Sequence, residues 1–314
     1  MRTLIAGGAG EVGRHLAKEF SRQGDEIRVL DRAPGRGEIE APIQYVQGDL
    51  SDRETVRKAV QGCEAVLHLA WSFADDPQVV FGEDIRGHVH LMEAASAEGI
   101  KSFIYASTAT VYGRAVLHPV TEDHPCLIVD ARKPIYALGK YVSEELCRVY
   151  HRERGLPITI FRFWWAYGES IGGRHLRELI GRILRHQPVD LVRGAGGAFL
   201  SMGDLGKAVK MAMANPAATG QTYNLGSFFL KWEEIAARLI ALAGSQSRLQ
   251  FVPPEQWRGP AFLNEVWDLS WKKAEKDLQY EPTDLSTALE GQFMSALRDC
   301  LNEVKKKVRN TLAF

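Results

Sequence analysis

The first half of the chain alternates short apolar, β-prone runs with stretches in which apolar residues recur at helical spacing. The apolar runs are continuous, which is typical of parallel strands buried on both faces. Strand-like runs occupy residues 3–7, 27–31, 43–47, 65–70, 102–107 and 158–165. Helical patterns lie between them at 11–24, 53–62 and 88–99, and around Tyr136 and Lys140. We therefore predict an α/β fold with a doubly wound parallel sheet.

From about Tyr167 the pattern changes to shorter, interleaved pieces. Helices are expected at 175–186, 203–215 and 232–244 and from Ser270 onward, with a strand at 188–192 and a flexible turn at 193–198. These pieces predict a smaller mixed α/β substrate-binding lobe over the carboxyl edge of the sheet, where open α/β folds bind ligands. The predicted boundaries are 1–166, with 197–226 returning, for the sheet domain, and 167–196 and 227–314 for the lobe.

Composition narrows the class of protein. The 314 residues carry 39 basic and 39 acidic side chains and are 45% hydrophobic, which favours a folded core and gives no reason to expect nucleic acid or a membrane as partner. Four widely spaced cysteines form no C-x-x-C pair, so free thiols are expected rather than disulfides or a metal site. The start lacks a signal-type apolar region and no 18-residue apolar run occurs, which predicts a cytoplasmic protein.

A glycine array stands where the first predicted strand meets the first helix. Gly7, Gly10 and Gly13 form G-x-x-G-x-x-G, with Glu11 and Val12 inside it. Glycine permits a tight turn and lets backbone approach a pyrophosphate, and the helix N-terminus behind it supplies N–H groups. In its strand–turn–helix context the array predicts a Rossmann-type dinucleotide site.

An acidic residue follows at the distance this site requires. Asp31 ends the second predicted strand, where a carboxylate accepts hydrogen bonds from the adenosine ribose and repels a 2′-phosphate. Arg32 comes next and could instead pair with such a phosphate. The sequence favours NAD over NADP, with NADP kept as the alternative.

A hydroxyl, a phenol and an amine are expected to converge at the same edge. Ser107 and Thr108 follow the strand at 102–107, and the helix with Tyr136 and Lys140 follows after a loop. Residues four apart on a helix share a face. A phenol is a weak base at neutral pH, and a nearby ammonium would bring its pKa toward the working range. This arrangement predicts acid–base chemistry.

At these residues the chain resembles the extended short-chain dehydrogenase/reductase family, the NAD-dependent epimerase/dehydratase group. The resemblance rests on segments that keep family order over nearly all 314 residues. They are GGAGEVG, VLD, GDLSD, LHLA, STATVYG, YALGK, FLSMGDLGKAV, YNLGS and DLSWKKAEKDLQYEP.

The resemblance implies roles for individual residues. Tyr136 matches the catalytic acid/base, and Lys140 its partner, which binds the nicotinamide ribose and lowers the pKa of the tyrosine. Thr108 matches the hydroxyl that binds the reacting substrate oxygen, with Ser107 beside it. The full set predicted to bind cofactor is Gly7, Gly10, Glu11, Val12, Gly13, Asp31, Arg32, Asp49, Leu50, Leu69, Ala70, Tyr136 and Lys140, with Asp49 and Leu50 flanking adenine.

Three departures from the family bear on the substrate. Ala109 and Thr110 replace the acidic pair of dehydratases, Trp165 stands where nucleotide-sugar members carry Asn, and Gly197 and Ala198 replace Arg-Asp. Dehydration is therefore unexpected, and a smaller or less charged substrate than a UDP-sugar is expected. The residues predicted to contact it are Trp71, Trp165, Arg174 and Arg193.

Taken together, the residues predict an NAD-dependent oxidoreductase or epimerase that moves hydride at a secondary alcohol or carbonyl of a sugar-like substrate. Two alternatives stay open: a nucleotide-sugar 4-epimerase, and a non-catalytic dinucleotide-binding sensor. The family resemblance also allows a homodimer.

Overall fold

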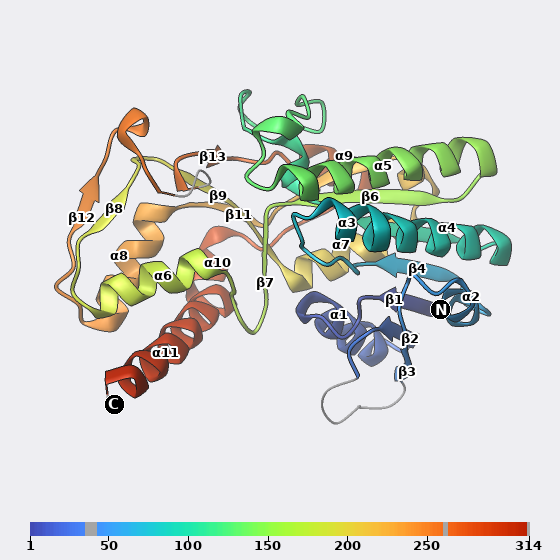
Figure 1. Ribbon diagram of the computed structural model, residues 1–314, viewed down its shortest axis with the longest axis horizontal. Helices are drawn as coiled ribbons and strands as arrows, with labels where there is room; N and C mark the ends of the chain where they lie inside the picture. Colours follow the sequence, from blue (N-terminus) through green and yellow to red (C-terminus); the bar gives the residue numbers. More distant parts are fainter. Residues whose placement is uncertain (35–42, 260–262, 313–314) are drawn as a thin grey trace.

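The computed structural model describes residues 1–34, 43–259 and 263–312. Its centre is a seven-stranded sheet in which every neighbouring pair is parallel (Figure 1). In order across the sheet, the strands are β10 (Thr222–Leu225), β6 (Ile158–Phe163), β5 (Ser102–Ala106), β4 (Ala65–His68), β1 (Arg2–Ala6), β2 (Glu26–Asp31) and β3 (Ile43–Gln47). The predicted fold class, a doubly wound parallel sheet, is confirmed.

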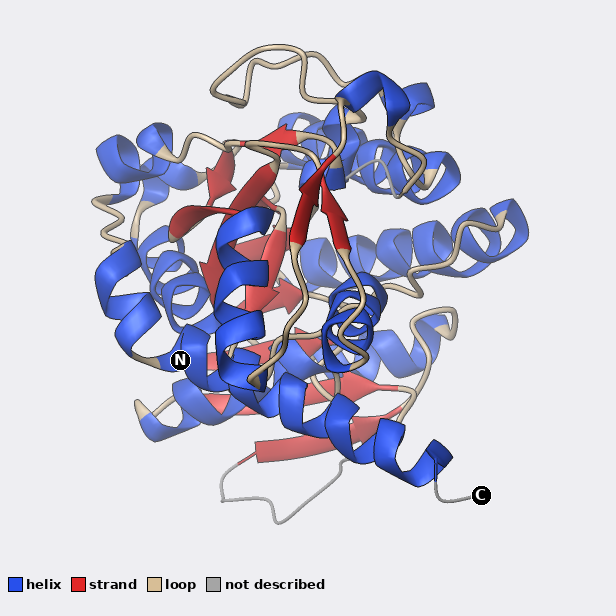
Figure 2. Cartoon of the chain, turned by 90° about the vertical axis from the view of Figure 1, so that its left-hand side faces the viewer, coloured by secondary structure: helices blue, strands red, loops and turns tan. Residues whose placement is uncertain are grey.

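Helices cover both faces of this sheet, as Figure 2 shows from the side. One layer consists of α1 (Glu11–Arg22), α7 (Met202–Ala214) and α9 (Lys272–Leu278), and the other of α2 (Arg53–Val60), α4 (Arg86–Glu98) and α5 (Pro134–Arg154). Strand residues alternate between the two cores: Ile5 packs under the first layer, and Leu4 and Ala6 under the second. Because both faces are covered, β1, β4 and β5 are almost wholly buried, which explains their continuous apolar sequence.

Local signals define the helix that carries Tyr136 and Lys140. Pro134 occupies the first turn of α5, where its missing N–H costs no hydrogen bond, and Gly155 ends the helix in the left-handed conformation. The helix α4 is preceded by a short turn, α3 (Pro77–Val79), and a π-helical turn, η1 (Val80–Ile85). Four short 3₁₀ turns, η2 (Ala109–Tyr112), η3 (Ile128–Asp130), η4 (Pro216–Ala218) and η5 (Pro254–Gln256), lie in connections.

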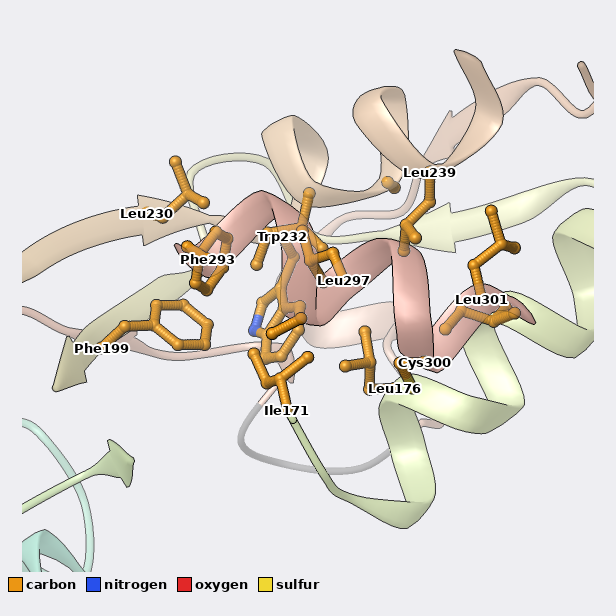
Figure 3. Packing of buried hydrophobic residues seen from close by; sticks show 14 of the residues in the cluster. Ile171, Leu176, Phe199, Leu230, Trp232, Leu239, Phe293, Leu297, Cys300 and Leu301 are labelled. Atoms are coloured by element: carbon orange, nitrogen blue, oxygen red, sulfur yellow. The ribbon is translucent and has the colours of Figure 1, made fainter. Parts of the chain in front are cut away.

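The second lobe lies at the carboxyl edge of the sheet, on the left in Figure 1. Its strands are β7 (Trp165–Tyr167), β9 (Gly196–Ser201), β11 (Phe228–Lys231) and β13 (Val266–Trp267) in one sheet, and β8 (Val189–Leu191) with β12 (Leu249–Phe251) in another. Its helices are α6 (Arg174–Leu184), α8 (Trp232–Ala243), α10 (Leu285–Glu290) and α11 (Gln292–Leu312). Figure 3 shows their shared core, in which Phe199, Trp232 and Phe293 meet leucines from α6, α8 and α11.

Two expectations concern the second lobe, the turn at 193–198 and the domain boundaries. The flexible turn predicted at 193–198 was wrong for its second half, because β9 begins at Gly196. A Cβ at Gly196 would lie 2.5 Å from the carbonyl oxygen of Leu230, so glycine lets β11 approach closely. The predicted domain boundaries stay a prediction. Within the stretch 197–226, β10 joins the central sheet, whereas β9 pairs inside the second lobe.

Candidate active site

The glycine array forms the turn between β1 and α1. Gly7 has a φ of +86°, and a Cβ there would lie 2.6 Å from the backbone nitrogen of Ala70. A Cβ at Gly13 would lie 2.4 Å from the Gly7 carbonyl oxygen. Gly10 is the N-cap residue of α1 and, having no side chain, makes no hydrogen bond to the first N–H groups of the helix. Gly7 and Gly13 are needed for a close approach of backbone, and the turn presents N–H groups as a pyrophosphate site would.

Asp31 lies at the carboxyl end of β2 beside this turn. Its carboxylate accepts hydrogen bonds from the backbone N–H groups of Ala9 and Ala33, each at 3.0 Å. These bonds fix the side chain at the rim where an adenosine ribose would lie.

A cleft of about 320 Å³ runs along this edge of the sheet. Its lining includes nine of the residues predicted to bind cofactor or substrate: Gly7, Gly10, Asp31, Arg32, Asp49, Leu50, Leu69, Ala70 and Trp71. It also includes Ser72 and Phe73, which follow Trp71 at the end of a predicted strand and could line the pocket, and residues that the sequence did not indicate: Ala9, Leu30, Ala33, Gly48, Glu83 and Asp84. The glycine turn, the acidic strand end and the cleft together fit a dinucleotide.

Two other predicted cofactor residues in the glycine turn point elsewhere. The Glu11 carboxylate contacts the hydroxyl of Ser170, which follows β7, and so links the turn to the second lobe. Val12 packs against the apolar core under α1.

Tyr136 and Lys140 lie one turn apart on α5 and are both buried. The backbone N–H of Tyr136 donates to the Asp75 carboxylate at 2.9 Å, which holds the start of the helix against the loop after β4. The Lys140 amine donates to the Ala106 carbonyl at 2.8 Å, directly before Ser107 and Thr108. It also lies 4.2 Å from the ring centre of Trp71. The amine therefore ties α5 to the end of β5.

Burial dominates the acid–base properties of this pair. It raises the pKa of Tyr136 well above its usual value, and a hydrogen bond with the Thr108 side chain acts in the opposite direction. Burial lowers the pKa of Lys140 to about 7, against the attraction of Asp84 and Glu144. Lys140 is not among the groups that shift the pKa of Tyr136, since its amine donates to Ala106 and lies over the rings of Trp71 and Tyr105, so its expected effect on the phenol stays a prediction.

The two predicted hydroxyls at the end of β5 have different surroundings. Thr108 caps the η2 turn by accepting a hydrogen bond from Thr110 N–H at 3.2 Å. Ser107 is buried and donates to the Glu144 carboxylate at 2.5 Å. Thr108 is therefore the hydroxyl associated with Tyr136, and Ser107 belongs to a buried network behind it.

Glu144 is the main polar residue that sequence reasoning missed. It is fully buried and forms a bidentate ion pair with Arg162 of β6, at 2.5 and 2.9 Å, besides its bond with Ser107. The sequence does carry a signal for Glu144, because polar residues recur every four positions on one face of α5, at Tyr136, Lys140, Glu144 and Arg148.

The loop after β4 covers the phenol. The Phe73 ring stacks on the Tyr136 ring at a centroid distance of 5.8 Å, although Phe73 is 64% exposed and has a φ of +58°. Asp84 accepts hydrogen bonds from the backbone and hydroxyl of Ser72, at 2.9 and 2.5 Å. No local sequence pattern marks these contacts, since they arise from packing of η1 and the loop against α5.

Of the four predicted substrate residues, only Trp71 lines the cleft. Trp165 packs in the aromatic core of the second lobe, 5.6 Å from Trp232. Arg174 is highly exposed and pairs with Glu178 at 2.7 Å, and Arg193 stacks on Phe251 at 3.8 Å. Their roles toward a substrate stay a prediction.

Trp165 and Gly197, two positions at which the chain departs from the family pattern, both lie beside the indole of Trp164. A Cβ at Gly197 would lie 2.4 Å from the indole of Trp164, and Trp164 lies 5.4 Å from Trp165 between ring centres. The indole of Trp164 thus fills the space beside Gly197 that a larger side chain would need.

Among the residues described, no cluster of three or more His, Cys, Asp or Glu side chains is arranged to hold a metal ion. None of the helices in the described ranges has the length and apolarity needed to span a membrane. The predicted homodimer and cytoplasmic location stay predictions.

Comparison with known proteins agrees with the motifs. Residues 3–226 match the model of a family described as the NAD dependent epimerase/dehydratase family. The chain is 27% identical to the uncharacterised protein y4nG of Sinorhizobium fredii over 80% of this chain and 62% of that protein, so it spans less than two thirds of that relative. It is 26% identical to UDP-glucose 4-epimerase of Corynebacterium glutamicum over 98% of this chain and all of that protein.

A solved structure supports the fold. A short-chain dehydrogenase/reductase superfamily protein from Agrobacterium tumefaciens, crystallised with bound NAD, superposes with a TM-score of 0.79 at 24% identity. The superposition covers 98% of this chain and all of that one. The resemblance inferred from the motifs is confirmed, and with it the expectation of an NAD-dependent enzyme of this class.

Proposed function

Because the chain belongs to the NAD dependent epimerase/dehydratase family, we propose that Tyr136, Lys140 and Thr108 catalyse the NAD-dependent oxidation of a secondary alcohol of a sugar-like substrate. The observation that carries this proposal is their convergence at the end of β5 beside the cleft. Lys140 bonds Ala106, two residues before Thr108, and Thr108 is associated with Tyr136.

Each residue has a distinct task in this proposal. Thr108 holds the reacting oxygen, so that its proton faces the phenol. Tyr136 takes that proton as general base, and returns it when a carbonyl is reduced. Lys140 supplies positive charge that favours the phenolate. NAD, when bound, accepts hydride from the carbon that bears the hydroxyl. Gly7, Gly10, Gly13 and Asp31 would hold it, with Asp49, Leu50, Leu69 and Ala70 along the cleft.

The same residues serve a dehydrogenase, which releases the oxidised product, and an epimerase, which inverts the carbon. A nucleotide-sugar 4-epimerase is the second candidate, favoured by the full-length match to the Corynebacterium glutamicum enzyme. Against it stand Gly197 and the arginines of the second lobe, since Arg174, Arg177 and Arg193 are engaged by Glu178, Glu303 and Phe251.

A substrate panel distinguishes these candidates. Wild-type protein is incubated with NAD and, separately, nucleotide sugars, free aldoses, uronates and hydroxy-ketones, and NADH absorbance and NMR of epimers are recorded. We expect turnover of a free sugar or uronate. Turnover confined to UDP- or GDP-sugars would select the second candidate, and no turnover of any class would favour the non-catalytic sensor.

The catalytic assignment is tested with Tyr136→Phe on whichever substrate turns over. Turnover should fall about 10²- to 10⁴-fold, the usual contribution of a positioned acid–base group, while NAD affinity is kept. Tyr141→Phe, on the same helix, is the matched control and should retain activity. Full activity of Tyr136→Phe would contradict the assignment.

A further inference from the structure

The cofactor cleft contains a cation whose role in an NAD site is not evident, the side chain of Arg32. It follows Asp31 directly and lines the same cleft. An arginine near this strand end is a group that can accommodate the 2′-phosphate of NADP. The chain therefore carries both an acidic residue that disfavours NADP and a cation that would favour it.

The structure shows the guanidinium of Arg32 between two carboxylates. One nitrogen lies 3.1 Å from Glu83 Oε2, as a hydrogen-bonded ion pair, and 3.7 Å from Asp49 Oδ2. Glu83 belongs to the π-helical turn η1, and Asp49 follows β3. Asp31 also lines the cleft, where its carboxylate is bound by the backbone N–H groups of Ala9 and Ala33.

The two carboxylates do not hold Arg32 equally. Asp49 is also bound by the backbone N–H of Ser51 at 2.8 Å and is the more distant partner. Glu83 makes the direct hydrogen bond to the guanidinium. The π-helical turn brings Glu83 and its neighbour Asp84 to the wall of the cleft, so the pair forms across two elements that are far apart in sequence.

We infer that Glu83 is a cofactor-specificity residue: it holds the Arg32 guanidinium, so that this cation is not available to a 2′-phosphate. The inference rests on the cofactor site of the proposed function. In this arrangement Asp31 disfavours NADP by its own charge, and Glu83 disfavours it by pairing with the guanidinium of Arg32. Binding of NAD, which has no 2′-phosphate, does not depend on the pair.

The test is isothermal titration of NAD and NADP into nucleotide-free wild type, Glu83→Gln, Arg32→Gln and the double variant. Because the side chains of Arg32 and Glu83 are 59% and 47% exposed, Glu83→Gln should bind NADP about fivefold more tightly than wild type, the upper range for an exposed ion pair, with NAD affinity changed less than about twofold. In the Arg32→Gln background the same substitution should leave NADP affinity unchanged. Glu54→Gln, which removes a similar exposed pair with Arg57 at 2.8 Å outside the cleft, is the matched control and should bind both nucleotides as wild type does.

Each other outcome overturns a stated part of the inference. If Glu83→Gln binds NAD normally and NADP no better, Glu83 does not govern specificity. If it improves NADP binding equally without Arg32, Glu83 repels the phosphate directly and the holding of Arg32 is wrong. If wild type binds neither nucleotide, the cofactor site itself is misplaced, a result that a specificity error cannot produce.

Discussion

Lys140 shows how function and stability conflict at a single residue. The side chain is 4% exposed, and its amine is held by one carbonyl and two aromatic rings, with no carboxylate of the described residues within ion-pair distance. Burial lowers its pKa to about 7, from 10.5 when the chain is unfolded. Between these values the unfolded state binds more protons than the folded one, so the buried amine lowers the free energy of unfolding, most strongly at and below pH 7.

Replacing this amine should therefore stabilise the fold. We expect Lys140→Met, which keeps the length of the side chain, to raise the free energy of unfolding at pH 7 by about 1–3 kcal/mol. The gain should shrink toward pH 10, where the unfolded lysine also loses its proton. Urea denaturation at both pH values measures it. Equal or lower stability of the variant at pH 7 would mean that the contacts to Ala106, Trp71 and Tyr105 outweigh the cost of burial.

At the scale of elements, α5 combines the reacting groups with the groups that position them. Tyr136 and Lys140 contact Phe73 and Trp71 of the cleft wall. The next two turns of the same helix face carry Glu144 and Arg148, which bind Ser107 after β5, Arg162 of β6 and Thr222 of β10. The buried ion pair of Glu144 with Arg162 fixes the helix to the sheet, so the angle of α5 sets where the phenol lies.

The packing of β4, α4 and α5 makes a second prediction. His68 of β4 and His88 of α4 stack at 5.1 Å and are buried beside Tyr105, Cys147 and Lys140. Burial lowers the pKa of His88 to about 3 and that of His68 well below its usual value. Both are neutral when folded, so the unfolded state takes up protons first as the pH falls below about 6.5.

Acid should consequently weaken the fold through these two rings. Each histidine should lower the free energy of unfolding by about 1.4 kcal/mol for each pH unit below 6.5. His68→Leu should remove about half of this slope between pH 6.5 and 5, as followed by urea denaturation. His186→Gln, at an exposed position, serves as control. An unchanged slope in His68→Leu would show that other groups cause the acid sensitivity.

At the scale of the whole molecule, the parts that could be predicted are those encoded locally. The continuous apolar strands, the glycine turn and the acidic end of β2 each have a short-range signature, and the structure has each where it was expected. Glu83 and Asp84 have no such signature, because their positions in the site depend on how η1 packs against the loop after β4 and against α5. The packing of partly buried Trp165 against the core of the second lobe likewise depends on tertiary contacts that its local sequence does not encode.

The contact between Trp164 and Gly197 restricts how this protein could accommodate arginine, the residue that the family resemblance leads us to expect at position 197. A single change of Gly197 to arginine would set its Cβ 2.4 Å from the indole, inside the aromatic core. A change of Trp164 alone would leave a cavity beside a glycine. Neither single variant is well packed, so placing arginine at position 197 requires position 164 to change as well. Changes in substrate range are therefore expected at other positions, such as those that line the cleft.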